Sequence, residues 1–364
     1  MKNYFLSKET FKYGFSIEHV NVYTNEEELY NYFKLNLESY YNVNKNIINL
    51  EGMDVFCIVD DLKKYIDMFD NSEIISYVSA SNHEHFNKKY FSENGVDCYY
   101  DSKDNYIVFD DCNNKNTVII SDRKKICKNC KTVIRDQILY GTEYRDSAIL
   151  IHGAGVIKDK KGFIITGNKR AGKTTTMINF LRNGFDFCSN DLSFVKEKDG
   201  KILIKGVPES IRIGVGTLSK CDELKYLVKD KNLLNKKDDE LFGLDVKYEI
   251  EWDELAEIYN CEVKSSWNNL NFVICPSLDI SLEKPEINML TEEEKDRILS
   301  ENIMSYGVES ENFWLQSLKR AKNFDEEKNK SLYNKLKKLP FIAFNYSGSY
   351  REIDKLILKI KDLV

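Results

Sequence analysis

The eight residues from Gly167 to Thr174 constrain this 364-residue chain most strongly, because they read G-x-x-x-x-G-K-T. The pattern is typical of a loop in which successive backbone N–H groups surround a phosphate. Residues 162–166 before the loop are apolar and β-branched, which predicts a strand. Residues 175–183 after it carry apolar side chains at helical spacing, and Gly184 follows where a helix would end. The sequence thus predicts a strand, a loop and a helix whose N-terminus faces an anion.

Within this motif, Lys173 is expected to reach the β- and γ-phosphates of a nucleotide, and the Thr174 hydroxyl to ligate Mg²⁺. The predicted cofactors are therefore ATP and Mg²⁺. Lys169 and Arg170 either contact the γ-phosphate or face solvent, and the sequence leaves both interpretations open. The residues predicted to bind the nucleotide are Gly167, Asn168, Lys169, Arg170, Ala171, Gly172, Lys173, Thr174, Thr175 and, from a later glycine-containing segment, Arg212.

Composition excludes several classes of protein. Hydrophobic residues make up 42% of the chain, which is enough for a packed core. The net charge is −6, and no basic stripe is interleaved with aromatic residues, so nucleic acid is not expected as a partner. No signal peptide or run of about 18 apolar residues is visible, which predicts a cytoplasmic protein without a membrane span. The nine cysteines lack the spacing of a disulfide framework, which fits the same compartment.

Cys127 and Cys130 form a single C-x-x-C pair. A structural zinc site needs four ligands, usually from a second pair, and no second C-x-x-C lies nearby in the sequence. A redox role would need a thioredoxin-like context, which is absent. Inert thiols are the favoured interpretation, with zinc or redox chemistry as the alternative.

The first 130 residues predict an α+β region of unknown role. A helix is expected at residues 26–37, strands at 53–59 and 74–78, and an antiparallel meander over 98–120. A further helix is expected at 132–140, ended by Gly141. We therefore divide the chain into residues 1–130 and a nucleotide-binding domain at 131–364.

A tight hairpin precedes the loop. The apolar run 148–157 is joined by a lysine-rich turn at 158–162 to the strand that enters the loop. Common phosphate-loop proteins continue by parallel crossovers, so this hairpin predicts a mixed, partly antiparallel sheet. Asp199-Gly200 predicts a second hairpin, and a strand at 271–275 is expected to stop at Pro276.

The segment from residue 149 to 191 resembles the catalytic domain of the HPr kinase/phosphorylase family. It also resembles relatives such as the kinases of lasso-peptide pathways. These proteins share their ATP-binding core with phosphoenolpyruvate carboxykinases. The resemblance implies an α/β (α+β) fold in which a mixed sheet carries the phosphate loop. The matching positions are His152, Gly153, the loop with Lys173 and Thr174, Arg182, Gly184 and the pair Asn190-Asp191.

The resemblance also implies catalytic roles for His152, Lys173, Asn190 and Asp191. In the family the first residue of an Asp-Asp pair is the general base, supported by the histidine, and the second belongs to the metal environment. Here the first position is Asn190, and Asp191 carries over to the metal position together with Thr174. His152 then either acts as the base or orients Asp191.

The sequence favours a kinase that transfers the γ-phosphate of ATP to a hydroxyl of a peptide, a protein or a small molecule. Residues 206–218 differ from the Glu-x-Arg-Gly signature of HPr kinases, which argues against HPr as the acceptor. The alternative is a nucleotide-binding regulatory or scaffold protein with a degenerate site, which Asn190 favours. A partition ATPase would place an extra lysine at position 168, where this chain has Asn168. The sequence does not decide whether the protein forms a homo-oligomer.

Overall fold

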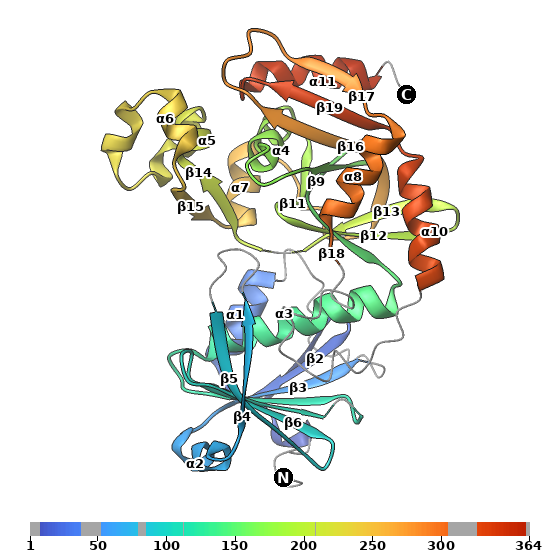
Figure 1. Cartoon of the computed structure of the whole chain (residues 1–364). Helices are drawn as coiled ribbons and strands as arrows, with labels where there is room; N and C mark the ends of the chain where they lie inside the picture. The colour runs from blue at the N-terminus through green and yellow to red at the C-terminus, as the bar shows by residue number, and fades with distance from the viewer. Residues whose placement is uncertain are drawn as a thin grey trace. The chain divides into compact units, whose positions relative to one another are not determined.

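The computed structural model describes residues 8–37, 52–78, 85–111, 113–207, 209–304 and 326–361 (Figure 1). The chain divides into two compact units, which we call unit 1 and unit 2. Unit 1 extends to Asp146, and unit 2 comprises Ser147–Met304 and Asp325–Val364. The boundary that the sequence suggested, between residues 130 and 131, lies inside the helix α3 (Ile126–Arg145) of unit 1.

Unit 1 contains one eight-stranded sheet in the order β1-β2-β3-β8-β7-β6-β5-β4. β2 and β8 are parallel to β3, and the other pairs are antiparallel. The predicted meander is confirmed as β6, β7 and β8. The strands are β1 (Tyr13–Ile17), β2 (Val20–Thr24), β3 (Met53–Val59), β4 (Glu73–Val78), β5 (His85–Glu93), β6 (Val96–Asp101), β7 (Tyr106–Asp111) and β8 (Asn116–Ser121).

Each face of this sheet buries apolar side chains. On one face a cluster that includes Phe69, Phe109 and Val118 packs with the short helices that follow β3. The long helix α3 packs against β3 and β8. The predicted stop at Gly141 is wrong, because α3 continues to Arg145. A Cβ at position 141 would lie 3.0 Å from the Cβ of His19, so the glycine there permits close packing instead of ending the helix. The other helices of unit 1 are η1 (Lys8–Thr10), α1 (Glu27–Leu37), α2 (Lys63–Ile66) and η2 (Asp67–Phe69).

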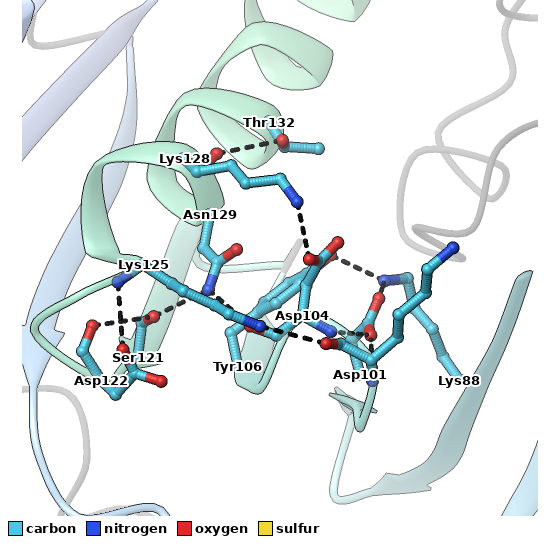
Figure 2. A network of polar contacts seen from close by, with 11 residues as sticks. Lys88, Asp101, Asp104, Tyr106, Ser121, Asp122, Lys125, Lys128, Asn129 and Thr132 are labelled. Atoms are coloured by element: carbon cyan, nitrogen blue, oxygen red, sulfur yellow. Dashed lines mark hydrogen bonds and ion pairs between the residues drawn. The ribbon is translucent and has the colours of Figure 1, made fainter.

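A polar network ties the sheet of unit 1 to the first turns of α3 (Figure 2). Lys88 on β5 is 1% exposed and forms an ion pair with Asp101, and it donates to the Tyr106 hydroxyl over 2.7 Å. In the adjoining turn, Asp104 accepts from Lys128 of α3 at 2.6 Å. Burial lowers the pKa of the Lys88 ammonium, with the Asp101 charge acting in the opposite direction. The contacts described for this network join residues of unit 1 to one another, which fits a structural role.

Unit 2 is built on a mixed sheet in the order β10-β9-β12-β13-β16-β19-β17, with β11 and β18 also paired to β9. β10 and β19 run parallel to β16, and the remaining pairs are antiparallel. β10 pairs with both β9 and β16, so the path through β9, β12, β13 and β16 closes on itself. The strands are β9 (Ile149–Lys158), β10 (Lys161–Thr166), β11 (Asp186–Ser189), β12 (Leu192–Lys198), β13 (Lys201–Gly206), β16 (Asn268–Leu278), β17 (Glu286–Met289), β18 (Ile303–Met304) and β19 (Phe341–Tyr346).

The predicted hairpins at 148–166 and around Asp199-Gly200 are both present. β16, however, does not stop at Pro276 as predicted and continues to Leu278. Proline cannot donate to a neighbouring strand. It is tolerated here because alternate N–H groups of β16 face β10, and the pairing with β10 already ends at Ile274.

The sheet of unit 2 has one helical layer on each side. Leu299 of α8 and Leu332 and Leu336 of α10 share a core with β9 and β16. On the opposite side α4 packs through Phe180, whose ring lies 6.1 Å from that of Phe163 on β10. The helices of unit 2 are α4 (Lys173–Arg182), α5 (Val215–Ser219), η3 (Asp222–Leu227), η4 (Lys231–Asn235), α6 (Asp238–Gly243), α7 (Trp252–Tyr259), α8 (Glu292–Asn302), α10 (Glu326–Lys337), η6 (Tyr350–Glu352) and α11 (Ile353–Lys361).

The sequence T-E-E-E at residues 291–294 is typical of a capping box, and the structure has one at the start of α8. The highly charged sequence of residues 311–339 predicts largely helical structure, which is confirmed over α10; residues 311–325 lie outside the described residues. Residues 350–364 carry apolar side chains at helical spacing, which predicts a terminal helix that packs on the core; it is confirmed as α11, where Ile353, Leu356 and Ile360 are buried. In the described part of the chain, no helix is long and apolar enough to cross a membrane.

Candidate functional site

The glycine motif forms a loop between β10 and α4. Gly167 has φ 147° and Gly172 has φ 94°, a region that side chains other than glycine rarely adopt. Arg170 also has a positive φ, 69°. A Cβ at Gly172 would lie 3.2 Å from the Cβ of Leu278 at the end of β16. The two glycines therefore allow the tight turn that brings the first residue of α4 directly behind the loop.

Lys173 is the first residue of α4, and its side chain folds back over the loop. Its Nζ donates to the carbonyl oxygen of Gly167 at 2.8 Å and to that of Asn168 at 3.2 Å. Burial lowers the pKa of this ammonium; Asp191 opposes the shift, and the charge of Lys247 adds to it. By contrast, Asn168, Lys169 and Arg170 are exposed.

Thr174 contacts Asn190, which lies in the bend between β11 and β12. The Thr174 hydroxyl is 3.2 Å from the Oδ1 of Asn190, which is 8% exposed. Residues 185–195 alternate between apolar and polar side chains, and in the structure they form two strands, β11 and β12, both paired to β9, with Asn190 and Asp191 between them. Because they lie in this bend, neither Asn190 nor Asp191 belongs to a strand.

Asp191 contacts His152 on β9. The His152 Nε2 lies 3.0 Å from the Asp191 Oδ1, and the Gly153 N–H donates to the Asp191 carbonyl at 2.8 Å. Burial opposes ionisation of the carboxyl group, but the bond from His152 and the charges of His152, Lys173 and Arg212 outweigh it, so the pKa of Asp191 lies below its usual value. The carboxylate is therefore ionised at neutral pH.

The family resemblance implied that Asp191 belongs to the metal environment with Thr174, and that His152 either acts as the base or orients Asp191. In the structure the histidine partner is Asp191, and the partner of the loop hydroxyl is Asn190. By contact, then, the carboxylate lies beside His152, and the neutral amide lies beside Thr174.

Three contacts hold α4 in place beside the loop. The Thr175 hydroxyl bonds that of Thr217 on α5 at 2.7 Å, and the Thr176 hydroxyl bonds that of Tyr346 on β19 at 2.8 Å. At the far end of α4, Arg182 forms a two-pronged ion pair with Glu223, with nitrogen–oxygen distances of 2.7 and 3.0 Å. Arg182 thus anchors η3 to α4, a structural contact at the position that matched the family motif.

Arg212 lies on β14 (Ile211–Gly214), which pairs with β15 (Lys247–Ile250) in a separate two-stranded ribbon. Its guanidinium is 3.9 Å from Glu249 and its side chain is 57% exposed. The positive charge of Arg212 helps to hold the Asp191 pKa down, which places it within electrostatic range of the site. Lys247 of β15 belongs to no sequence motif, and only the fold brings its charge within range of Lys173 in the loop.

The described residues contain no group of three or more histidine, cysteine, aspartate or glutamate side chains placed to hold a metal. Cys127 and Cys130 lie on α3 of unit 1, and burial raises the pKa of both thiols. Thiols with raised pKa are poor nucleophiles and poor metal ligands, which fits the interpretation of inert thiols.

No family model and no curated protein matches this sequence. Among solved structures, the chain is similar to that of the Hpr(Ser) kinase/phosphatase from Coxiella burnetii. The match has 12% sequence identity and a TM-score of 0.29, and it covers 58% of this chain and 98% of that one. Since this TM-score is too low to assign a fold, the functional case depends on the residues of the site.

Proposed function

We propose that unit 2 is an ATP- and Mg²⁺-dependent kinase domain with an HPr kinase-like core, which transfers the γ-phosphate to a hydroxyl of a peptide, a protein or a small molecule. The observation that carries the proposal is the convergence of two groups. The ionised Asp191 lies within range of the Lys173 charge, and Lys173 belongs to a loop with the phosphate-binding sequence. A nucleotide phosphate and a carboxylate base would therefore meet in one place, as phosphoryl transfer to a hydroxyl requires.

The proposed nucleotide site uses the backbone N–H groups of residues 167–172 and the N-terminus of α4. Lys173 would leave the carbonyl oxygens of Gly167 and Asn168 and bind the β- and γ-phosphate oxygens instead. Exchanging two neutral acceptors for anionic ones is favourable, since hydrogen bonds to charged groups are stronger.

The residues beside the loop fit a magnesium ion. Mg²⁺ prefers oxygen ligands, keeps several waters and is held in proteins by one or two side chains and the substrate phosphates. Thr174 Oγ1 and Asn190 Oδ1 are two such oxygens 3.2 Å apart, close enough to share one ion. When bound, Mg²⁺ would neutralise charge on the β- and γ-phosphate oxygens.

Asp191 is the proposed general base. Its ionised carboxylate would accept the proton of the acceptor hydroxyl as the hydroxyl oxygen bonds to the γ-phosphorus and the bond from that phosphorus to the β–γ bridging oxygen breaks. ADP would leave with its charge neutralised by Lys173. His152 would position the carboxylate through the 3.0 Å contact and disperse its charge.

Asn190 supports the second candidate, a nucleotide-binding regulatory protein. A neutral amide beside Thr174 would bind Mg²⁺ more weakly than a carboxylate. Nucleotide binding is common to both candidates, so transfer of phosphate is the observation that separates them.

The test is incubation of the protein with γ-labelled ATP, Mg²⁺ and candidate acceptors, including the products of neighbouring genes. The kinase proposal expects label on an acceptor, with loss of the label in Lys173→Ala and Asp191→Asn. Lys201→Gln serves as the control, because this exposed lysine lies at the opposite end of β12 and β13 from Asp191. ATP binding without transfer or hydrolysis under any condition would favour the regulatory protein instead.

A further inference from the structure

The ribbon of β14 and β15 presents a polar face. In its antiparallel register Arg212 is opposite Glu249, and Gly214 is opposite Lys247. Directly opposed residues lie on the same side of a sheet, so these four positions share one face. Ile211, Ile213 and Ile250, on the other face, are buried.

The end of the ribbon that carries Lys247 is fixed to the first turn of α4. Gly214 is followed directly by α5, and the Val215 N–H donates to the Val246 carbonyl at 3.0 Å. Thr217 of α5 then bonds Thr175, two residues after Lys173. A Cβ on Gly216 would lie 2.7 Å from the Phe242 ring, so α5 and α6 pack tightly against each other. The position of Lys247 is therefore set by the same elements that hold the loop.

The side chain of Lys247 has an unusual electrostatic setting. It is exposed and stands opposite a glycine, and the described residues provide no ion pair for it. Its charge acts on Lys173, whose pKa it helps to lower. Two ammonium groups that repel each other are unfavourable unless an anion lies between them. Most exposed lysines have no partner, but Lys247 is tied to the phosphate loop through α5, which bonds Val246 at one end and Thr175 of α4 through Thr217.

We propose that Lys247 is a second phosphate-binding lysine, which contacts the γ-phosphate of the nucleotide. The inference deepens the proposed function and depends on it. A further cation is needed most at the γ-phosphate, where charge is redistributed during transfer. Lys247 is suited to this task because its flexible stem ends in a compact charge with three donors.

Calorimetric titration with MgATP and MgADP tests this assignment on the wild-type chain, Lys247→Gln, Lys247→Arg and the control Lys201→Gln. We expect Lys247→Gln to bind MgATP about five- to tenfold more weakly while its affinity for MgADP changes by less than about twofold. Lys247→Arg should recover part of the MgATP affinity, and Lys201→Gln should match the wild type.

Two failures are distinguishable. If the wild-type chain binds MgATP and Lys247→Gln binds it equally well, or loses MgATP and MgADP affinity to the same extent, the γ-phosphate assignment is overturned and the proposed function stands. If the wild-type chain binds neither nucleotide, the proposed function is overturned, and the assignment of Lys247 with it.

Discussion

The Thr174 hydroxyl lies 3.2 Å from the side-chain oxygen of Asn190, a residue that is almost fully buried. The hydroxyl of the loop thus faces a neutral amide, while the carboxylate of the next residue, Asp191, faces His152. Under the proposed function, Asp191 would serve as the base for the acceptor hydroxyl, and Asn190 would be a weaker magnesium ligand than a carboxylate. This division of tasks leads to separate expectations for the two residues.

Asn190→Asp should strengthen magnesium binding. A carboxylate beside Thr174 adds a charged ligand, so the Mg²⁺ concentration that gives half-maximal ATP binding should fall about tenfold. Without metal, the new charge is buried next to Asp191, and the thermal midpoint should fall by a few degrees and recover when Mg²⁺ is added. The measurement is a Mg²⁺ titration of ATP binding together with melting curves. An unchanged magnesium requirement would place the metal elsewhere.

Asp191→Asn should separate catalysis from binding. Removal of a general base typically lowers the rate by about 10²- to 10⁴-fold, whereas the affinity for MgATP should change little. Single-turnover transfer from labelled ATP, combined with calorimetry on the same samples, measures both quantities. His152→Ala should give a smaller loss, because it removes the residue that positions the base. Full transfer activity in Asp191→Asn would rule out this residue as the base.

The ion pair of His152 and Asp191 should contribute to stability in a pH-dependent way. The pKa of Asp191 in the folded chain lies below its ordinary value of 3.8, so its contribution is fully present above 3.8 and is lost as the pH falls through the lower, folded value. Its carboxylate is 51% exposed, so solvent screening limits the contribution to about 1 kcal/mol or less. Urea unfolding of the wild type and Asp191→Asn should show this gap near pH 5, and the gap should shrink as the pH falls below 3.8. A gap that widens in acid would contradict the assignment.

In unit 1, Lys88→Met should be strongly destabilising. The substitution leaves Asp101, which is buried, without its cation, and breaking a buried pair in this way costs about 3–5 kcal/mol. Adding Asp101→Asn should recover part of the loss, because the amide is neutral and keeps an oxygen for the N–H groups of Lys103 and Asp104. The control is Lys128→Met, whose exposed pair with Asp104 is worth about 1 kcal/mol or less. Equal losses in Lys88→Met and Lys128→Met, measured by urea unfolding, would show that burial of this pair is unimportant.

Much of the local structure was predictable from the sequence. The hairpin of β9 and β10, the loop and α4 follow from periodicity and glycine placement, because they are contiguous in the chain. The errors at Gly141 and Pro276 have a different origin. In both cases a residue that often ends an element is tolerated by tertiary packing, against His19 in one and at the end of the β10 pairing in the other.

The pairing within the site was not predictable. Asn190 and Asp191 are adjacent in the sequence, and only the bend between β11 and β12 determines which of them meets Thr174 and which meets His152. The role of Lys247 was even less predictable from the sequence, since this residue lies in a charge-dense segment without a motif. Its relation to the loop depends on the register of the ribbon and on the bond between Thr175 and Thr217.

The central claim is that residues 167–174 bind a nucleotide phosphate, and calorimetric titration of MgATP into the wild-type chain and Lys173→Ala tests it most directly. We predict saturable one-to-one binding to the wild type, at least about tenfold weaker binding to Lys173→Ala, and unchanged melting of the variant without nucleotide. Absence of binding to the folded wild-type chain, or equal affinity in the two proteins, would contradict the claim.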